Sequence, residues 1–324
     1  PGRDINFDIG RIKGYRNFCN KIWNAFRFIE MQVSNHDYQP NDKSEDILSD
    51  WMGSKIHQTA QNCQTHIKQY RFDLASAEIY ELIWSNFCDW YIEFSKVAIQ
   101  KSDETSQINN LIGNLIANFY SILELLHPFM PFITEELSSK LADLAKVEKS
   151  GFLVEGGFEH ARVSKKKTEQ QLDEIINIIS SLRVLRAENQ NIKNETFNLI
   201  VSNDLNSEMQ SVISENEEII AGIAKLDGIE FSDKIPGESI EKTMDGYKLI
   251  IPLEGLIDPE EEMMRLQKEL EDVENDIQII SSKLANEQFI SKAPAAVVEK
   301  ETAKVADAES KKAMLEKSIA KLQP

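Results

Sequence analysis

The sequence predicts a mainly α-helical protein with an antiparallel helical bundle, a small α+β domain and a C-terminal antiparallel coiled-coil hairpin. Apolar residues recur with the helical period from residue 14 to about 146. Strand-like runs follow between about 197 and 253. From residue 258 onward the apolar period changes to seven, which is typical of a coiled coil. These three patterns predict domains at 1–149, 150–257 and 258–324.

Clusters of turn residues divide the first domain into helices. They predict helices over 11–33, 46–69, 74–100 and 105–126. A further short helix is expected with Thr134 as its N-cap and with Glu135 and Glu136 in its first turn, where they favour the helix dipole. His127 is expected to end the preceding helix by bonding a carbonyl. The segment 82–94 is aromatic on all sides, which predicts a central, buried helix.

The second domain begins as a linker at about 147–170 and continues as a small α+β unit. The pattern predicts a sheet of about three strands with a hairpin turn at Asp245-Gly246, and helices over about 168–188 and 205–222. This unit carries no catalytic signature, and we interpret it as a spacer or packing module.

Two heptad seams build the third domain. The seam residues are Leu266, Leu270, Val273, Ile277, Ile280 and Leu284, and then Val298, Val305, Ala308, Leu315, Ile319 and Leu322. The two helices should fold back on each other as an arm without an interior for an active site. Residues 258–276 hold nine acidic and two basic side chains, whereas 277–324 hold eight lysines and six acidic side chains. Positive charge is therefore expected at the tip and on the returning helix, unless these charges serve only solubility.

Composition limits the kinds of function that are open to the chain. It has 324 residues and a formal net charge of −18, which disfavours indiscriminate nucleic-acid binding. It contains neither an apolar run long enough to span a membrane nor the pattern of a signal peptide, so a cytoplasmic location is expected. The start lacks Met, which suggests the C-terminal portion of a longer protein. Cys19, Cys63 and Cys88 lack metal-ligand spacing and are expected to be free buried thiols.

Residues 14–31 carry two different stripes along one helix. One stripe is apolar and should face the core: Phe18, Ile22, Ala25, Phe26, Ile29 and Val33. The opposite stripe joins amides, a cation and a ring, with further polar and basic neighbours: Asn17, Lys21, Asn24 and Phe28, flanked by Lys13, Asn20 and Arg27. Residues 1–31 hold six basic and three acidic side chains in an otherwise acidic chain. Such a face is suited to unpaired bases, although each residue alone is compatible with an ordinary solvated surface.

Motifs of nucleotide chemistry and hydrolysis do not occur in the sequence. Neither G-x-x-x-x-G-K-[ST] nor G-x-G-x-x-G is found, and the five histidines form no H-E-x-x-H. We therefore expect no catalytic residue, metal or cofactor in this chain.

Three runs resemble the anticodon-binding helical domain of the valyl-tRNA synthetase family, and the isoleucine and leucine relatives have weaker forms of them. The runs are GRDINFD-x-x-R-x-x-GYRNFCNKIWNAFRF at the start, FCDWYIE at 87–93 and HPFMPFITEEL at 127–137. The final segment, LIDPEEEMMRLQKELEDVENDI and KLANEQFISKAPAAVVEKE, is similar to the C-terminal arm of the valine enzymes.

The resemblance implies a class I aminoacyl-tRNA synthetase, which attaches valine to its tRNA with ATP and magnesium. The HIGH and KMSKS motifs of the catalytic domain are absent from these residues, so the chain should bind tRNA without aminoacylating it. Its implied partners are valine tRNA and its own N-terminal catalytic domain, in a monomer without membrane contact.

The resemblance also assigns roles to side chains. Phe28 would stack on an anticodon base, and Asn17, Lys21 and Asn24 would contact base edges or phosphates. The cations that would position the backbone are Arg11, Lys13, Arg16 and Arg27. The coiled-coil arm would brace the outer corner of the tRNA through Lys283, Lys292 and Lys304.

Two alternatives remain at this point. One is a fragment of an isoleucyl- or leucyl-tRNA synthetase, which the coiled coil disfavours. The other is a non-enzymatic helical scaffold whose arm grips a protein, which the heptads and the acidic charge allow.

Overall fold

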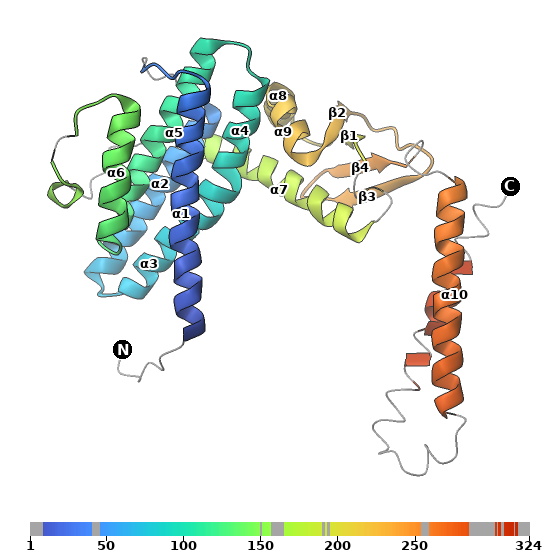
Figure 1. Cartoon of the computed structure of the whole chain (residues 1–324). Helices are drawn as coiled ribbons and strands as arrows, with labels where there is room; N and C mark the ends of the chain where they lie inside the picture. Colours follow the sequence, from blue (N-terminus) through green and yellow to red (C-terminus); the bar gives the residue numbers. More distant parts are fainter. Residues whose placement is uncertain are drawn as a thin grey trace.

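The computed structural model contains a helical bundle, a small α+β unit and a long helix that stands apart from both (Figure 1). It describes residues 9–40, 46–149, 151–156, 165–189, 192, 195–253, 259–284, 302, 304–305, 308–313 and 315–316. No helix in these ranges combines the length and the apolar character that crossing a membrane requires.

The bundle is built from helices that run alternately up and down (Figure 1). Its elements are α1 (Ile9–Asn35), α2 (Ile47–Lys68), α3 (Phe72–Glu81), the π-helix η1 (Leu82–Tyr91), α4 (Ile92–Lys101), α5 (Thr105–Leu126) and α6 (Pro131–Ala145). The predicted helix over 105–126 is confirmed, and the one over 74–100 is continuous from α3 through η1 to α4. Asp46 caps α2 by accepting a 2.8 Å hydrogen bond from the Ser49 amide.

The aromatic segment 82–94 lies in the core of the bundle, as predicted. Phe87, Tyr91 and Phe94 are almost completely buried. The rings of Phe87 and Phe119 stack with their centroids 5.3 Å apart, and the Asn118 amide donates a 2.8 Å hydrogen bond to the Tyr91 hydroxyl. The core therefore holds stacked rings and a buried polar group that has a partner.

The start of α6 differs from the sequence prediction. The helix begins at Pro131 rather than after Thr134, because proline is favoured in the first turn, where its missing N–H costs nothing. Thr134 lies inside the helix, and its hydroxyl donates to the Met130 carbonyl at 2.8 Å. His127 is the C-cap of α5 as predicted, and its amide donates to the Leu123 carbonyl at 2.9 Å, while its ring bonds this hydroxyl through Nδ1 at 2.8 Å.

Glu135 holds the segment that follows α6 against this helix. Its carboxylate pairs with Lys149 and accepts a 3.0 Å hydrogen bond from the Leu153 amide, at the start of the 3₁₀ turn η2 (Leu153–Glu155). Burial acts to raise the pKa of Glu135, but these two partners together bring it below its ordinary value. Because α6 begins at Pro131, Glu135 and Glu136 lie beyond its first turn, so their predicted place at the positive end of the helix dipole is wrong, and Glu135 acts as a tether instead.

Among the described residues, the α+β unit contains four strands instead of about three. Its elements are α7 (Lys166–Glu188), β1 (Phe197–Val201), α8 (Ser207–Glu215), α9 (Glu217–Ala224), β2 (Leu226–Phe231), β3 (Ser239–Thr243) and β4 (Lys248–Pro252). The sheet order is β2-β1-β4-β3, with β1 and β2 parallel and the other pairs antiparallel. Gly246, with φ +87°, lies in the predicted hairpin turn. The helix expected over 205–222 is two helices, which meet at Asn216.

Helix α7 joins the α+β unit to the bundle. Asp173 on α7 accepts 2.8 Å hydrogen bonds from the Trp51 indole and from Lys55, both on α2. At a second joint, a Cβ added to Gly222 on α9 would lie 2.7 Å from Val97 Cγ1 on α4, so only glycine allows this approach. The apolar core runs from the bundle into the sheet without interruption.

The three cysteines are free. Cys63 and Cys88 are buried as predicted, whereas Cys19 is only partly buried. Burial raises the pKa of Cys63 to about 11 and that of Cys88 to about 12. Both thiols are therefore protonated at neutral pH and behave as small core residues.

Arg186, near the end of α7, is a buried cation that is held by carbonyls. Its guanidinium donates to the backbone oxygens of Ile192, Glu195, Ala224 and Lys225. Its guanidinium carbon lies 4.3 Å from the centre of the Phe197 ring. Burial lowers the pKa of Arg186 below its ordinary value. One side chain thus ties α7 to β1 and to the end of α9.

We predict that Arg186→Met destabilises the chain by about 3 kcal/mol, because buried carbonyls would lose their donor. Arg183→Met, three residues earlier on an exposed face, should cost less than about 1 kcal/mol. Urea denaturation followed by circular dichroism measures both. Equal midpoints for the two variants would contradict the role of Arg186 as a tie.

Candidate nucleic-acid interface

Helix α1 buries the side that the helical period predicted. The side chains in the core are Phe18, Ile22, Ala25, Phe26 and Ile29, and Val33 is half-buried. On the opposite side Asn17, Asn24 and Arg27 are exposed. Helix α1 thus presents two amides and one guanidinium to solvent, while its other side is packed in the core.

Lys21 lies at the edge of this line and is already engaged. Its ammonium is 2.6 Å from the Asp89 carboxylate and 3.9 Å from the centre of the Trp84 ring, both on η1. Only 23 % of the Lys21 side chain is exposed. The predicted Lys21 contact with a base or phosphate is untested, but in this structure its ammonium joins α1 to η1 instead of pointing freely into solvent.

The π-helical winding of η1 explains how Lys21 reaches both partners. Trp84 and Asp89 are five residues apart, and in an α-helix they would point about 140° apart. In a π-helix the hydrogen bonds join residues i and i+5, so these two side chains come to the same face. Trp84 is further supported by Tyr80, whose ring stacks on it with the centroids 5.5 Å apart.

Phe28 is less exposed than its place on the polar stripe predicted. Its side chain is partly buried and packs against the main apolar cluster. Helix α1 contacts α5 and α6 as well as η1, so its buried arc is wider than a helix with a single neighbour would have. Lys21 and Phe28 lie within roughly 20° of each other on the wheel, and both belong to the flank of this arc.

The structure describes the side chains of some, but not all, of the cations predicted around the face. Lys13 and Arg16 are exposed, in line with a backbone-positioning role that no structural observation tests. The side chain of Arg11 lies outside the described residues. Helix α1 also exposes two aromatic residues that sequence reasoning missed, Tyr15 at 65 % and Trp23 at 37 %. Their exposure depends on where the neighbouring helices end, which periodicity does not reveal.

The arm forms a packed pair of helices where it is described. Its first helix is α10 (Pro259–Leu284), and residues described between 302 and 316 are helical. Seam residues from both helices meet: Leu270, Val273, Ile277, Ala308 and Leu315. Lys312 crosses between them to Glu274 at 2.6 Å. The predicted hairpin is confirmed for these positions. Lys283 and Lys304 are exposed, whereas Lys292 lies outside the described residues.

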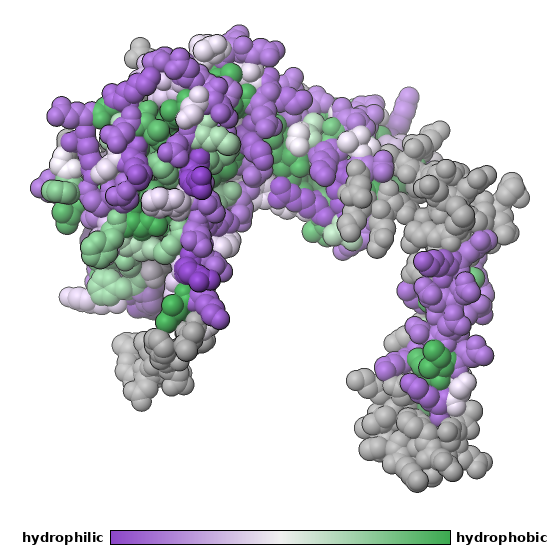
Figure 2. All heavy atoms as spheres, viewed as in Figure 1, coloured by the Kyte–Doolittle hydropathy of each residue, from purple (hydrophilic) through white to green (hydrophobic). Residues whose placement is uncertain are grey.

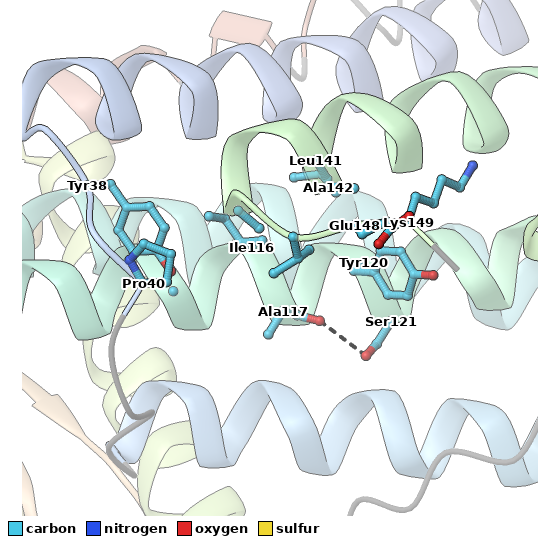
Figure 3. A pocket seen from close by; sticks show the side chains of 13 residues that line it. Tyr38, Pro40, Ile116, Ala117, Tyr120, Ser121, Leu141, Ala142, Glu148 and Lys149 are labelled. Carbon is cyan, nitrogen blue, oxygen red and sulfur yellow. Dashed lines mark hydrogen bonds between the residues drawn. The ribbon is translucent and has the colours of Figure 1, made fainter. Parts of the chain in front are cut away.

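A cavity of about 550 Å³ lies apart from the α1 face, between α5 and α6 (Figure 3). Its walls include Tyr38, Ile116 and Leu141, and Tyr120, Glu148 and Lys149 add polar side chains. The Ser121 hydroxyl donates to the Ala117 carbonyl of its own helix, and Lys149 is bound to α6.

Comparison with known proteins decides the family. Residues 49–201 match the anticodon-binding domain of tRNA ligases, and residues 258–323 match the valyl-tRNA synthetase tRNA binding arm. The chain is 37% identical over 308 residues to the valine--tRNA ligase of Francisella tularensis subsp. tularensis, a match that covers 94% of this chain and 33% of the relative. The chain belongs to the valyl-tRNA synthetase family.

The matched ranges agree with the architecture. The anticodon-binding range runs from α2 through α7 to the end of β1, so it includes the α7 contacts with α2. The arm range coincides with the paired helices that start at α10. Its identity as the arm of the valine enzymes separates this synthetase region from the isoleucine and leucine relatives, and family membership disfavours the unrelated scaffold. The chain spans about a third of the length of the curated relative that it matches.

We predict that Lys21→Met lowers the stability of this synthetase region by about 1 kcal/mol, because an ion pair and a cation–π contact between α1 and η1 are lost. Lys13→Met, on an exposed turn of α1, should change it by less than about 0.5 kcal/mol. Chemical denaturation measures the two differences. A Lys21→Met variant as stable as Lys13→Met would show that the Lys21 contacts contribute nothing.

Proposed function

We propose that this chain is the tRNA-binding region of a valine–tRNA ligase and that α1 reads the anticodon loop. The exposed line of Asn17, Asn24 and Arg27 carries the proposal, because amides and a guanidinium can bond base edges and phosphates of an unpaired loop. The matches to an anticodon-binding domain over residues 49–201 and to a tRNA binding arm support tRNA binding by the chain, whereas the role of α1, which precedes both matched ranges, is inferred from its exposed face. Valine attachment, with ATP and magnesium, would be carried out by the part of the enzyme outside this chain.

Phe28 contributes to this face from a half-buried position. Its ring is partly buried and packs against the core cluster. A ring held in this way has little side-chain entropy to lose when a base stacks on it. Partial burial therefore favours a stacking role for Phe28 more than free exposure would.

The arm is proposed to contact the body of the tRNA through exposed lysines near its tip. Lys283 lies in the last turn of α10 and is exposed. The acidic residues before it, among them Glu271 and Asp272, would repel phosphates along the stem of the arm. Contact at the tip should consequently be short and sensitive to salt. The whole enzyme is proposed to act as a cytoplasmic monomer on valine tRNA.

We predict that the chain binds a valine tRNA transcript and loses at least about tenfold in affinity when the anticodon is changed. Fluorescence anisotropy at two salt concentrations measures this difference, with the tRNA body kept constant. Equal affinity for both transcripts would contradict anticodon reading. Absence of binding to either transcript at low salt would instead favour a scaffold.

We further predict that Phe28→Leu weakens binding to the valine transcript by roughly tenfold while the bundle stays folded, because leucine fills the core side of the site but offers no plane for stacking. Val33→Leu, at another half-buried position on α1, is the matched control and should leave affinity unchanged. Unaltered affinity of the folded Phe28→Leu variant would rule out stacking by Phe28.

A further inference from the structure

The cavity between α5 and α6 is bounded by two connecting segments that are fixed to the bundle (Figure 3). On one side Lys146 donates to the Tyr38 carbonyl at 2.9 Å and to the Gln39 side chain at 3.0 Å, which holds the segment after α1. On the other side the pairing of Lys149 with Glu135 holds the segment after α6. The space of about 550 Å³ is therefore preformed, as small-molecule sites usually are.

Two tyrosine hydroxyls line the cavity without a hydrogen-bond partner among the described residues. They belong to Tyr38 and Tyr120, which lie at its opposite ends (Figure 3). Only 6% of Tyr38 is exposed, and a Cβ added to Gly113 would lie 3.2 Å from its hydroxyl oxygen, so the lack of a side chain at this position lets the phenol lie against α5. Burial raises the pKa of Tyr38, which keeps the hydroxyl protonated at neutral pH. A buried donor without an acceptor in the described protein is available to an acceptor on a ligand.

The Tyr120 end of the cavity is negatively charged. Glu148 lines this end and has no ion-pair partner among the described residues. The neighbouring cation, Lys149, is paired with Glu135, and its ammonium points away from the cavity in Figure 3. Burial, and then the carboxylates of Glu124 and Glu135, raise the pKa of Tyr120. A cation that enters this end therefore meets an available carboxylate.

The walls between the two ends are mainly apolar, with Ile116, Leu141 and Ala142 among them. The lining residues on α5 run from Gly113 to Ser121, which is about 12 Å of helix at the usual rise per residue. A space of this length and volume is suited to a compact apolar body, such as a pair of fused rings, with a polar group at each end.

We propose that this cavity binds a small apolar amine, with its ammonium beside Glu148 and with a hydrogen-bond acceptor at the other end, opposite the Tyr38 hydroxyl. Charge complementarity selects this class, because an ammonium gains a charge-assisted bond there, whereas a carboxylate or a phosphate would meet acidic side chains. The site goes beyond tRNA binding and does not rest on it. The lining comes from other elements than α1, whose exposed side is mainly hydrophilic in Figure 2.

Binding of 5-methoxytryptamine tests the site, because its ammonium and its ether oxygen lie at opposite ends of two fused rings. Ligand-observed NMR titration compares it with 5-methoxyindole-3-acetate, which has a carboxylate for the ammonium, and with tryptamine, which lacks the ether. The chain should bind methoxytryptamine at least about tenfold more tightly than the acetate and several-fold more tightly than tryptamine. Equal affinity for the cation and the anion, or no binding of methoxytryptamine at millimolar concentration, overturns the proposal.

Two variants assign the ends of the bound amine. Glu148→Gln should reduce the preference for methoxytryptamine over the acetate several-fold, and Tyr38→Phe should make methoxytryptamine bind no better than tryptamine. Glu81→Gln, at an exposed position on α3 outside the cavity lining, is the matched control and should change neither ratio.

Stability measurements keep these results interpretable. Since the Tyr38 hydroxyl has no partner among the described residues, Tyr38→Phe should leave the urea midpoint unchanged. Glu148 is exposed, so Glu148→Gln tests the charge at this end even where Tyr38→Phe lowers stability. A folded Glu148→Gln variant that keeps the full preference for the cation overturns the assignment of the ammonium to Glu148, and the proposal with it.

Discussion

Helix α7 is bound on one side to the bundle and at its end to the α+β unit, and the position of the α+β unit relative to the bundle depends on these contacts. At one side Asp173 accepts hydrogen bonds from Trp51 and Lys55 of the bundle, and at its end Arg186 binds the carbonyls of Ala224 and Lys225. β1 follows α7 and pairs with β4, the last strand before the arm. A continuous set of contacts therefore runs from the bundle to β4.

The polar face on α1 depends on a second fixed contact, the one between Lys21 and η1. Since Asp89 and Trp84 restrain Lys21, the helix is held against rotation about its own axis. Asn17 and Asn24 are then presented in a constant orientation, which reduces the ordering cost when a ligand binds. In the proposed function, Lys21 would contribute to recognition in this way even while its ammonium is paired inside the protein.

Much of the fold follows from local sequence patterns, because helical period and heptads report which side of an element is buried. The helix over 105–126 and the seam through Leu270, Val273 and Leu315 are examples. The fourth strand was less visible, since β3 reads SIEKT and lies at the sheet edge, half exposed. A strand of this kind is defined by its partner β4 and not by its own alternation.

The candidate site was predicted less completely than the fold, because the burial of some of its residues depends on neighbouring helices and not on local sequence. Asn17, Asn24 and Arg27 are exposed as the wheel predicts, because they lie far from every neighbouring helix. Lys21 and Phe28 lie on the flank, where burial depends on how closely η1, α5 and α6 approach α1. A single sequence does not contain that distance, and it gives no sign that residues 82–91 wind as a π-helix.

The charge distribution explains how an acidic chain can bind a polyanion selectively. With a formal charge of −18, the overall field repels tRNA, and only places with locally concentrated cations attract it. Lys21 is paired with Asp89, and Lys312 is paired with Glu274, so these two cations are less available to attract tRNA. Added salt screens the attraction at the α1 face and the repulsion elsewhere together. Affinity should consequently fall with salt less steeply than the number of contacting cations alone would require, and in the proposed function the discrimination between tRNAs comes from base contacts on α1.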